Sequence, residues 1–268
     1  METENQKRLT CAIATAIEAG QILMRYWRTP LDIQYKKDEF DPVTRADRES
    51  DEFIRTRIFK EFPSDMILSE ENDLTPERYD ERVWMIDPLD ATDAFTNGLD
   101  AFSVSIGCVQ NGIPEIGVVF APARGVLYYG MKGNGAFMKK GEETKQIFGS
   151  TVSTLSQSRI IVRLPGKDKR PLDDRVAQVP AKLFIEEGSI ALSIARVAAG
   201  DAECTICTNP RVSKWDSAGG QAILEEVGGV VTDTHGSPLD YKQAGRGWSN
   251  LVVASANPNV HAEFIAKL

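Results

Sequence analysis

The segment that decides the fold is Trp84-Met-Ile-Asp-Pro-Leu-Asp-Ala-Thr92. An apolar run enters it, and Asp87 and Asp90 follow with Pro88 between them. Proline fixes φ and removes a backbone donor, so we expect the strand to end there and the chain to turn. Asp87 and Asp90 can then point at a common centre, where a cation relieves their repulsion. The ordinary alternative is a helix that starts at Asp90 and leaves Asp87 in solvent.

Three other acidic groups stand at the ends of predicted elements, beside apolar residues. Glu70 and Glu71 follow the short apolar run 66–68, Asp216 begins a predicted helix after a tryptophan, and Asp47 lies in another predicted helix. Carboxylate oxygens suit Mg²⁺, which takes one or two carboxylates together with water and substrate phosphate. Four such settings in one chain favour a metal site over a solvated acidic surface.

Hydrophobic periodicity outside these motifs predicts an α+β protein. Apolar residues recur at helical spacing in 6–27 and 44–62, and Asn111-Gly112 is a hairpin signal between two strands. We expect an antiparallel-rich part over residues 1–145 and an α/β part over 146–268, joined by a polar connection at 141–154. Further helices are expected at 188–199 and 217–227. The expected strands lie at 33–37, 66–68, 83–86, 103–109, 115–120, 125–131, 159–163, 202–208, 230–231 and 251–254.

Two short motifs have ordinary structural explanations. Gly130, Gly133 and Gly135 lack the Walker lysine and the strand-to-helix context of a phosphate loop, so a hairpin turn is expected. Cys204 and Cys207 form a C-x-x-C, but the segment looks like a strand, which places the two thiols on opposite faces. A zinc site also needs two more ligands, and the chain has only two histidines.

Composition narrows the class of protein. The chain has 268 residues, a formal net charge of −8, 42% hydrophobic and 26% charged residues, which is ordinary for a globular protein. An acidic chain is a poor candidate for binding a nucleic acid polymer. No apolar run is long enough to span a bilayer, and the first ten residues are polar, so we expect no membrane association and a cytoplasmic location.

Four motifs together resemble the inositol monophosphatase superfamily, Mg²⁺-dependent and often lithium-sensitive phosphatases. They are D-P-V-T-x-A-D (41–47), S-E-E (69–71), W-x-I-D-P-L-D-x-T (84–92) and W-D-x-A-G-G (215–220), in the family's order and over nearly the whole chain. The resemblance implies a layered αβαβα sandwich, two or three Mg²⁺ ions and a small phosphate ester as the substrate, and homodimers are common in that superfamily.

The resemblance also implies a role for each site residue. Glu70, Asp87 and the carbonyl of Leu89 would bind one Mg²⁺, and Asp87, Asp90 and Asp216 a second. Glu71 would lie beside a weaker third site, with Trp215 as a supporting neighbour. Asp47 and Thr92, together with Glu70, would orient and deprotonate the attacking water. Backbone N–H groups of Ala91 and Thr92 would hold phosphate oxygens, as helix starts commonly do.

The substrate is less well determined by the sequence. Ala91 replaces a glycine usual in the family, Lys214 precedes Trp215, and Asn209 replaces a glutamate that contacts inositol hydroxyls. These features favour a 3′(2′),5′-bisphosphate nucleotidase, and inositol monophosphatase or another small-molecule phosphatase of the family is the alternative. A protein that kept the fold but lost turnover, because the Ala91 methyl crowds the phosphate, is a remote alternative.

A second substrate phosphate would need a cation. Arg211, Lys214 and the loop 167–170 are candidates, although a charged loop is more often a solvated turn. Gly188 and Ser189 could bind a sugar hydroxyl or phosphate, and an ordinary helix N-cap explains them equally well.

Overall fold

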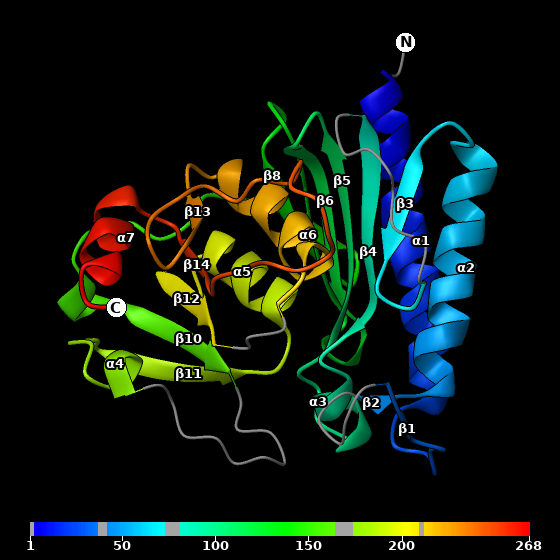
Figure 1. Cartoon of the computed structure of the whole chain (residues 1–268), viewed down its shortest axis with the longest axis horizontal. Coiled ribbons are helices and arrows are strands. Elements are labelled where there is room, and N and C mark those ends of the chain that lie inside the picture. The colour runs from blue at the N-terminus through cyan, green and yellow to red at the C-terminus, as the bar shows by residue number, and fades with distance from the viewer. Residues whose placement is uncertain (1–2, 37–41, 73–80, 164–173, 209–211) are drawn as a thin grey trace.

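The computed structural model describes residues 3–36, 42–72, 81–163, 174–208 and 212–268. Figure 1 shows five layers in the order helix, sheet, helix, sheet, helix. Helices α1 (Glu4–Tyr26) and α2 (Arg45–Glu61) cover the outer face of a large sheet, and α5 (Ile190–Ala198) and α6 (Lys214–Glu225) lie between the two sheets. Helices α4 (Asp174–Ala177) and α7 (Pro258–Ile265) form the far layer. The expected α+β class and layered αβαβα sandwich are confirmed.

The large sheet has seven strands in the order β3-β4-β5-β6-β7-β8-β9. Only the β3–β4 pair is parallel, and every later neighbour is antiparallel. The predicted hairpin at Asn111-Gly112 joins β5 to β6, and both residues have positive φ, as a tight hairpin turn requires. The strands are β3 (Met66–Ser69), β4 (Arg82–Asp90), β5 (Ser103–Gln110), β6 (Ile113–Ala121), β7 (Val126–Met131), β8 (Ala136–Lys140) and β9 (Glu143–Ile147).

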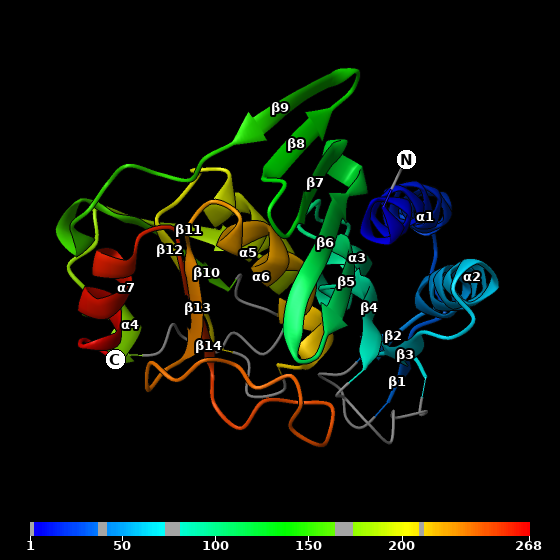
Figure 2. The same cartoon turned by 90° about the horizontal axis from the view of Figure 1, so that it is seen from above.

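The last hairpin corrects the expected polar connection at 141–154. Residues 143–147 form β9, which pairs with β8, and Figure 2 shows this hairpin projecting from the body of the molecule. The two lysines of β8 and the exposed polar residues of β9 concealed the alternation that would have predicted it. The glycine motif forms the β7–β8 turn as expected, where Glu226 accepts the backbone N–H groups of Gly133, Asn134 and Gly135.

The second sheet has five strands in the order β11-β10-β12-β14-β13. Its β11-β10-β12 part is parallel and its β12-β14-β13 part antiparallel. Cys204 and Cys207 lie on β12, in two different apolar clusters, as the strand expectation requires. The bounds are β10 (Arg159–Arg163), β11 (Leu183–Glu187), β12 (Cys204–Cys207), β13 (Val230–Asp233) and β14 (Val252–Ser255).

Glycines bring the central helix α6 unusually close to the large sheet. A Cβ atom on Gly117 of β6 would lie 2.0 Å from the carbonyl oxygen of Gly219, and one on Gly107 of β5 would lie 2.7 Å from Ala218 Cβ. Such contacts are forbidden, so any side chain at either position would push the helix away. This approach places the first turn of α6 beside the end of β4.

The remaining elements are short. Strands β1 (Gln34–Tyr35) and β2 (Pro42–Val43) form a small antiparallel pair, and α3 (Thr92–Thr96) follows β4 directly. One-turn 3₁₀ helices lie at Pro122–Arg124 and Leu155–Gln157. Among the described residues, no helix combines the length and the apolar character needed to cross a membrane.

Candidate active site

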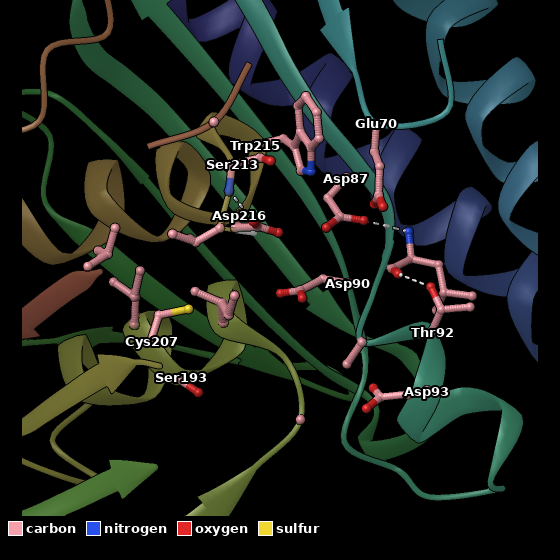
Figure 3. Close-up of a pocket in the computed structure, with 18 of the residues that line it drawn as sticks. Glu70, Asp87, Asp90, Thr92, Asp93, Ser193, Cys207, Ser213, Trp215 and Asp216 are labelled. Atoms are coloured by element: carbon pink, nitrogen blue, oxygen red, sulfur yellow. Dashed lines mark hydrogen bonds between the residues drawn. The ribbon is translucent and has the colours of Figure 1, made fainter. Parts of the chain in front are cut away.

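Three aspartates converge where the end of β4 meets the first turn of α6. Asp87 and Asp90 come from β4 and Asp216 from the first turn of α6; one carboxylate oxygen of each lies within 4.8 Å of the others. All three are buried, and Figure 3 shows them facing a common centre.

Strand β4 does not stop at Pro88, which corrects the expectation of a strand end. The strand continues to Asp90, and its register against β5 shifts between Asp87 and Asp90. Residues three apart on a regular strand face opposite sides, whereas a local irregularity can turn both to one side. The irregularity also accommodates Pro88, which has no N–H for the ladder. The two carboxylates therefore share a face because the strand is distorted.

The three carboxylates are electrostatically unfavourable without a cation. Burial, reinforced by neighbouring carboxylates, raises the pKa of Asp87 and of Asp216 well above the usual range. Burial also raises the pKa of Asp90 to about 7, although two hydrogen bonds act against it. A divalent cation with a preference for oxygen ligands removes this repulsion, so the donor set fits Mg²⁺.

Each aspartate is oriented by local hydrogen bonds. Asp87 Oδ1 accepts the backbone N–H of Leu89 at 3.0 Å, and Asp216 Oδ2 accepts that of Ser213, the N-cap of α6, at 2.5 Å. Asp90 Oδ2 accepts the Ser189 hydroxyl at 2.6 Å and the N–H of Ala191 at 2.8 Å. Ser189, expected as a substrate contact, is thus the N-cap of α5 and a support for Asp90.

Asp47 and Thr92 form a hydrogen-bonded pair beside this cluster. Thr92 Oγ1 lies 3.0 Å from Asp47 Oδ1 and 3.2 Å from the carbonyl oxygen of Leu89. Asp47 is the third residue of α2, where its Oδ2 accepts the N–H and hydroxyl of Thr44 at 2.8 and 2.6 Å. Burial raises the pKa of Asp47 to about 6 despite those bonds. The carboxylate can therefore exchange a proton near neutral pH.

Glu70 and Glu71 follow β3 and share a cation that the sequence did not single out. Lys36 Nζ donates to Glu70 Oε1 at 2.9 Å and also to Glu71. Burial opposes the charge of Lys36, yet the two carboxylates hold its pKa above the usual range. Burial raises the pKa of Glu71 to about 7, with Lys36 opposing the shift. Lys36 stands in a predicted strand without a motif, so no sequence pattern marks it.

The remaining predicted site residues divide into three groups. Leu89, Ala91, Gly188 and Trp215 line the cavity at the aspartates, and Ala91 has a left-handed backbone. Lys214 does not line the cavity. Its side chain is fully buried, and its ammonium donates to the carbonyls of Tyr241 and Gln243. This position corrects its expected role at a substrate phosphate. Asn209, Arg211 and the loop 167–170 lie outside the described residues.

The cavity has a volume of about 810 Å³ and two different walls. Its acidic wall carries the aspartates, Glu70 and Glu71. Its other wall is largely apolar and comes from α5, β12, β14 and the segment before α6. That apolar wall consists of Ile190, Ile194, Cys207, Val212, Val252 and Ala254. No sequence pattern marks this wall, because its positions have the same apolar pattern as core residues.

Comparison with known proteins gives one consistent family. A model of the inositol monophosphatase family matches residues 4–268. The 3′(2′),5′-bisphosphate nucleotidase CysQ of Haemophilus influenzae is 30% identical over 246 residues, covering 91% of this chain and 90% of that protein. The fructose-1,6-bisphosphatase/inositol-1-monophosphatase of Thermotoga maritima is 34% identical over 229 residues, covering 85% and 86%.

The solved structure of an inositol monophosphatase from Thermotoga maritima superposes with a TM-score of 0.83 at 30% identity, covering 97% of this chain and 96% of that one. The fold and the sequence of this chain match that family over almost its whole length, and its acidic cluster fits a metal site. The chain belongs to the inositol monophosphatase family and is a metal-dependent phosphomonoesterase.

Proposed function

We propose that the protein is a Mg²⁺-dependent 3′(2′),5′-bisphosphate nucleotidase that converts 3′-phosphoadenosine 5′-phosphate to AMP and phosphate. The observation that carries this proposal is the apolar wall beside the aspartates, which includes Ile194, Cys207 and Val252. A purine has flat apolar faces that such a wall can bind, whereas inositol presents hydroxyl groups all around its ring and needs polar partners.

The residues of the site then have distinct tasks. Asp87, Asp90 and Asp216, with Glu70 and the Leu89 carbonyl, would hold the Mg²⁺ ions. Bound Mg²⁺ supplies Lewis-acid stabilisation of the phosphoryl oxygens and a water of lowered pKa.

Thr92 Oγ1 orients the attacking water, and Asp47 Oδ1 takes up the proton through Thr92. The pKa of about 6 at Asp47 suits that transfer near neutral pH. The N–H groups of Ala91 and Thr92 hold the phosphate while the ester bond breaks.

Inositol monophosphatase is the second candidate, because Lys214 lies away from the cavity. Its ammonium binds backbone carbonyls and is not available to a second phosphate. The cations that do line the described cavity, Lys36, Arg48 and Arg246, each bond to protein oxygens. A substrate with a single phosphate needs none of them.

A substrate panel separates the two candidates. We expect kcat/KM for 3′-phosphoadenosine 5′-phosphate to exceed that for inositol 1-phosphate, fructose 1,6-bisphosphate and histidinol phosphate at least tenfold, with and without lithium. Tenfold corresponds to about 1.4 kcal/mol of transition-state discrimination. Asp216→Asn serves as the control for a contaminating phosphatase with every ester. A tenfold preference for inositol 1-phosphate would overturn the nucleotidase proposal.

A further inference from the structure

We propose that Arg246 is a positioning residue that fixes Glu70 relative to Asp216, so that carboxylates from the two halves of the chain meet the same metals. The inference rests on the proposed role of Glu70 as a metal ligand. Arg246 belongs to none of the four sequence motifs. It lies in the long segment between β13 and β14 and lines the cavity next to Trp215 and Glu70.

On one side Arg246 binds the backbone at Glu70. Its Nη2 donates to the carbonyl oxygens of Ser69 at 2.6 Å and Glu70 at 2.9 Å. The N–H of Glu70 donates to the carbonyl oxygen of Ile86 on β4 at 3.1 Å. Strand β3 is four residues long and forms the edge of its sheet, so Glu70 has strand pairing on one side only. Arg246 thus supplies the second restraint on the Glu70 backbone.

On its other side Arg246 contacts the start of α6. Its guanidinium carbon lies 4.8 Å from the ring centroid of Trp215, the residue before Asp216. Its carbonyl oxygen accepts the N–H of Lys214 at 2.9 Å, and the N–H of Trp248 donates to Val212 at 3.0 Å. The segment 246–248 therefore runs beside 212–214 and moves with the helix that carries Asp216.

These contacts make one connection between two metal ligands that are far apart in sequence. Glu70 lies on the large sheet and Asp216 on the central helix layer, and Arg246 contacts the backbone of the first and the neighbour of the second. A planar guanidinium can stack on an indole while its N–H groups bind carbonyls, whereas an ammonium is a compact point charge. Residues that orient metal ligands typically change metal affinity 10–100-fold when they are removed.

The positive charge of Arg246 weakens metal binding, whereas its positioning of Glu70 strengthens it, so the two effects can be separated by mutation. A cation near a divalent metal repels it, so loss of charge alone would strengthen metal binding. Arg246→Met removes both the charge and the donors but keeps an apolar side chain against Trp215. Arg246→Lys keeps the charge but lacks the planar fork. Positioning predicts weaker binding in both variants, whereas a purely electrostatic role predicts tighter binding in the first and no change in the second.

The experiment titrates Mn²⁺ into the metal-free full chain and follows free Mn²⁺ by electron paramagnetic resonance. The Mg²⁺ concentration for half-maximal phosphate release is measured in parallel. The control is Arg28→Met, because Arg28 also binds a backbone carbonyl, that of Gly98 at 3.1 Å, places its guanidinium carbon 4.1 Å from the ring centroid of Trp27, and does not line the cavity. Thermal unfolding of all variants checks the fold.

We expect Arg246→Met and Arg246→Lys to raise the Mn²⁺ dissociation constant about tenfold or more. Their Mg²⁺ requirement should rise in parallel, and kcat should recover largely at saturating Mg²⁺, whereas Arg28→Met should bind Mn²⁺ as the wild type does. Unchanged Mn²⁺ affinity in both Arg246 variants, or tighter binding in Arg246→Met alone, would overturn the proposal. Glu70→Gln identifies the source of a failure. If it also binds Mn²⁺ normally, Glu70 is not a ligand and the proposed metal set is wrong as well.

Discussion

Ala91 adopts a left-handed backbone, with φ 73° and ψ 56°, at the junction between β4 and α3. That conformation costs a residue with a Cβ atom roughly 1–2 kcal/mol, while glycine adds roughly 0.4–1 kcal/mol of unfolded-state entropy. We therefore expect Ala91→Gly to raise the free energy of unfolding by about 0.5–1 kcal/mol, measured by urea denaturation.

A matched control for that change is Gly188→Ala, a second small residue at the cavity. A Cβ atom at Gly188 would lie 2.3 Å from the carbonyl oxygen of Ala101, so this variant should lose stability by about 1–3 kcal/mol. An Ala91→Gly protein less stable than the wild type would show that the left-handed turn carries no strain.

Asp90 illustrates how a functional residue can destabilise the fold that holds it. Without metal it stands buried beside Asp87 and Asp216, and burial and nearby carboxylates raise its pKa to about 7. We expect Asp90→Asn to raise the melting temperature of the metal-free protein, because one buried negative charge is removed. Added Mg²⁺ should stabilise the wild type and have little effect on the variant. Scanning calorimetry in EDTA and in Mg²⁺ measures both; a lower metal-free melting temperature in the variant would contradict this view.

At the scale of elements, helices α1, α2, α5 and α6 and most strands were predictable because their apolar spacing is regular. Helix α2 begins one residue after Thr44 and ends before Phe62, close to the prediction. What sequence could not show was the continuation of β4 through Pro88, which depends on pairing with β5. Strands β2, β8, β9 and β11 and the short helices α3, α4 and α7 were not expected from the sequence. In β9 the outward polar residues follow no alternation.

The site was predictable to a similar extent. Carboxylates in motifs were identified, since their residue type and setting both point to a metal. Lys36 and Arg246 were missed because they reach Glu70 through tertiary contacts, Lys36 to its carboxylate and Arg246 to its backbone. Lys214 was assigned to the substrate because it directly precedes Trp215-Asp216 and a second phosphate would need a cation, although residues two apart on a helix face different directions.

The start of α6 gives a prediction about Lys214. If Lys214 bound a second phosphate, its loss would cost 3′-phosphoadenosine 5′-phosphate far more than 3′-AMP, by about tenfold or more in KM. Because its ammonium binds the 241–243 backbone, we expect the ratio of the two KM values in Lys214→Met to stay within about twofold of the wild type. A tenfold change in that ratio would return Lys214 to the substrate site.

The difference in stability between the wild type and Lys214→Met should also depend on pH. Burial lowers the folded-state pKa of Lys214 to about 8, so between pH 8 and about 10 the unfolded chain binds more protons than the folded one. Stability of the wild type relative to Lys214→Met should therefore increase as the pH rises through this range. Urea denaturation at pH 7.5 and 9.5 measures the difference; equal differences at both values would show that the pKa of Lys214 is not lowered.

At the scale of the whole molecule, the layers explain why the site lies where it does. The large sheet contributes Asp87 and Asp90, and the helix layer between the sheets contributes Asp216 and the serine that supports Asp90. Bound metal would add a connection between two layers that already meet through apolar packing, glycine contacts and hydrogen bonds such as that from Ser189 to Asp90. Both sheets and the helices between them also build the cavity, so substrate and metal are held at one junction.

Phosphate-ester hydrolysis should depend on metal held by Asp87, Asp90 and Asp216. The most direct measurement is the initial rate of inorganic phosphate release, from whichever ester of the panel is turned over fastest, as a function of Mg²⁺ concentration in the wild type and in folded Asp216→Asn. We predict no release in EDTA, a saturable increase with Mg²⁺ in the wild type, and a rate reduced at least about a hundredfold in the variant, since several kcal/mol of transition-state stabilisation depend on the metal. Release in EDTA, or a near-normal rate in Asp216→Asn, would contradict it.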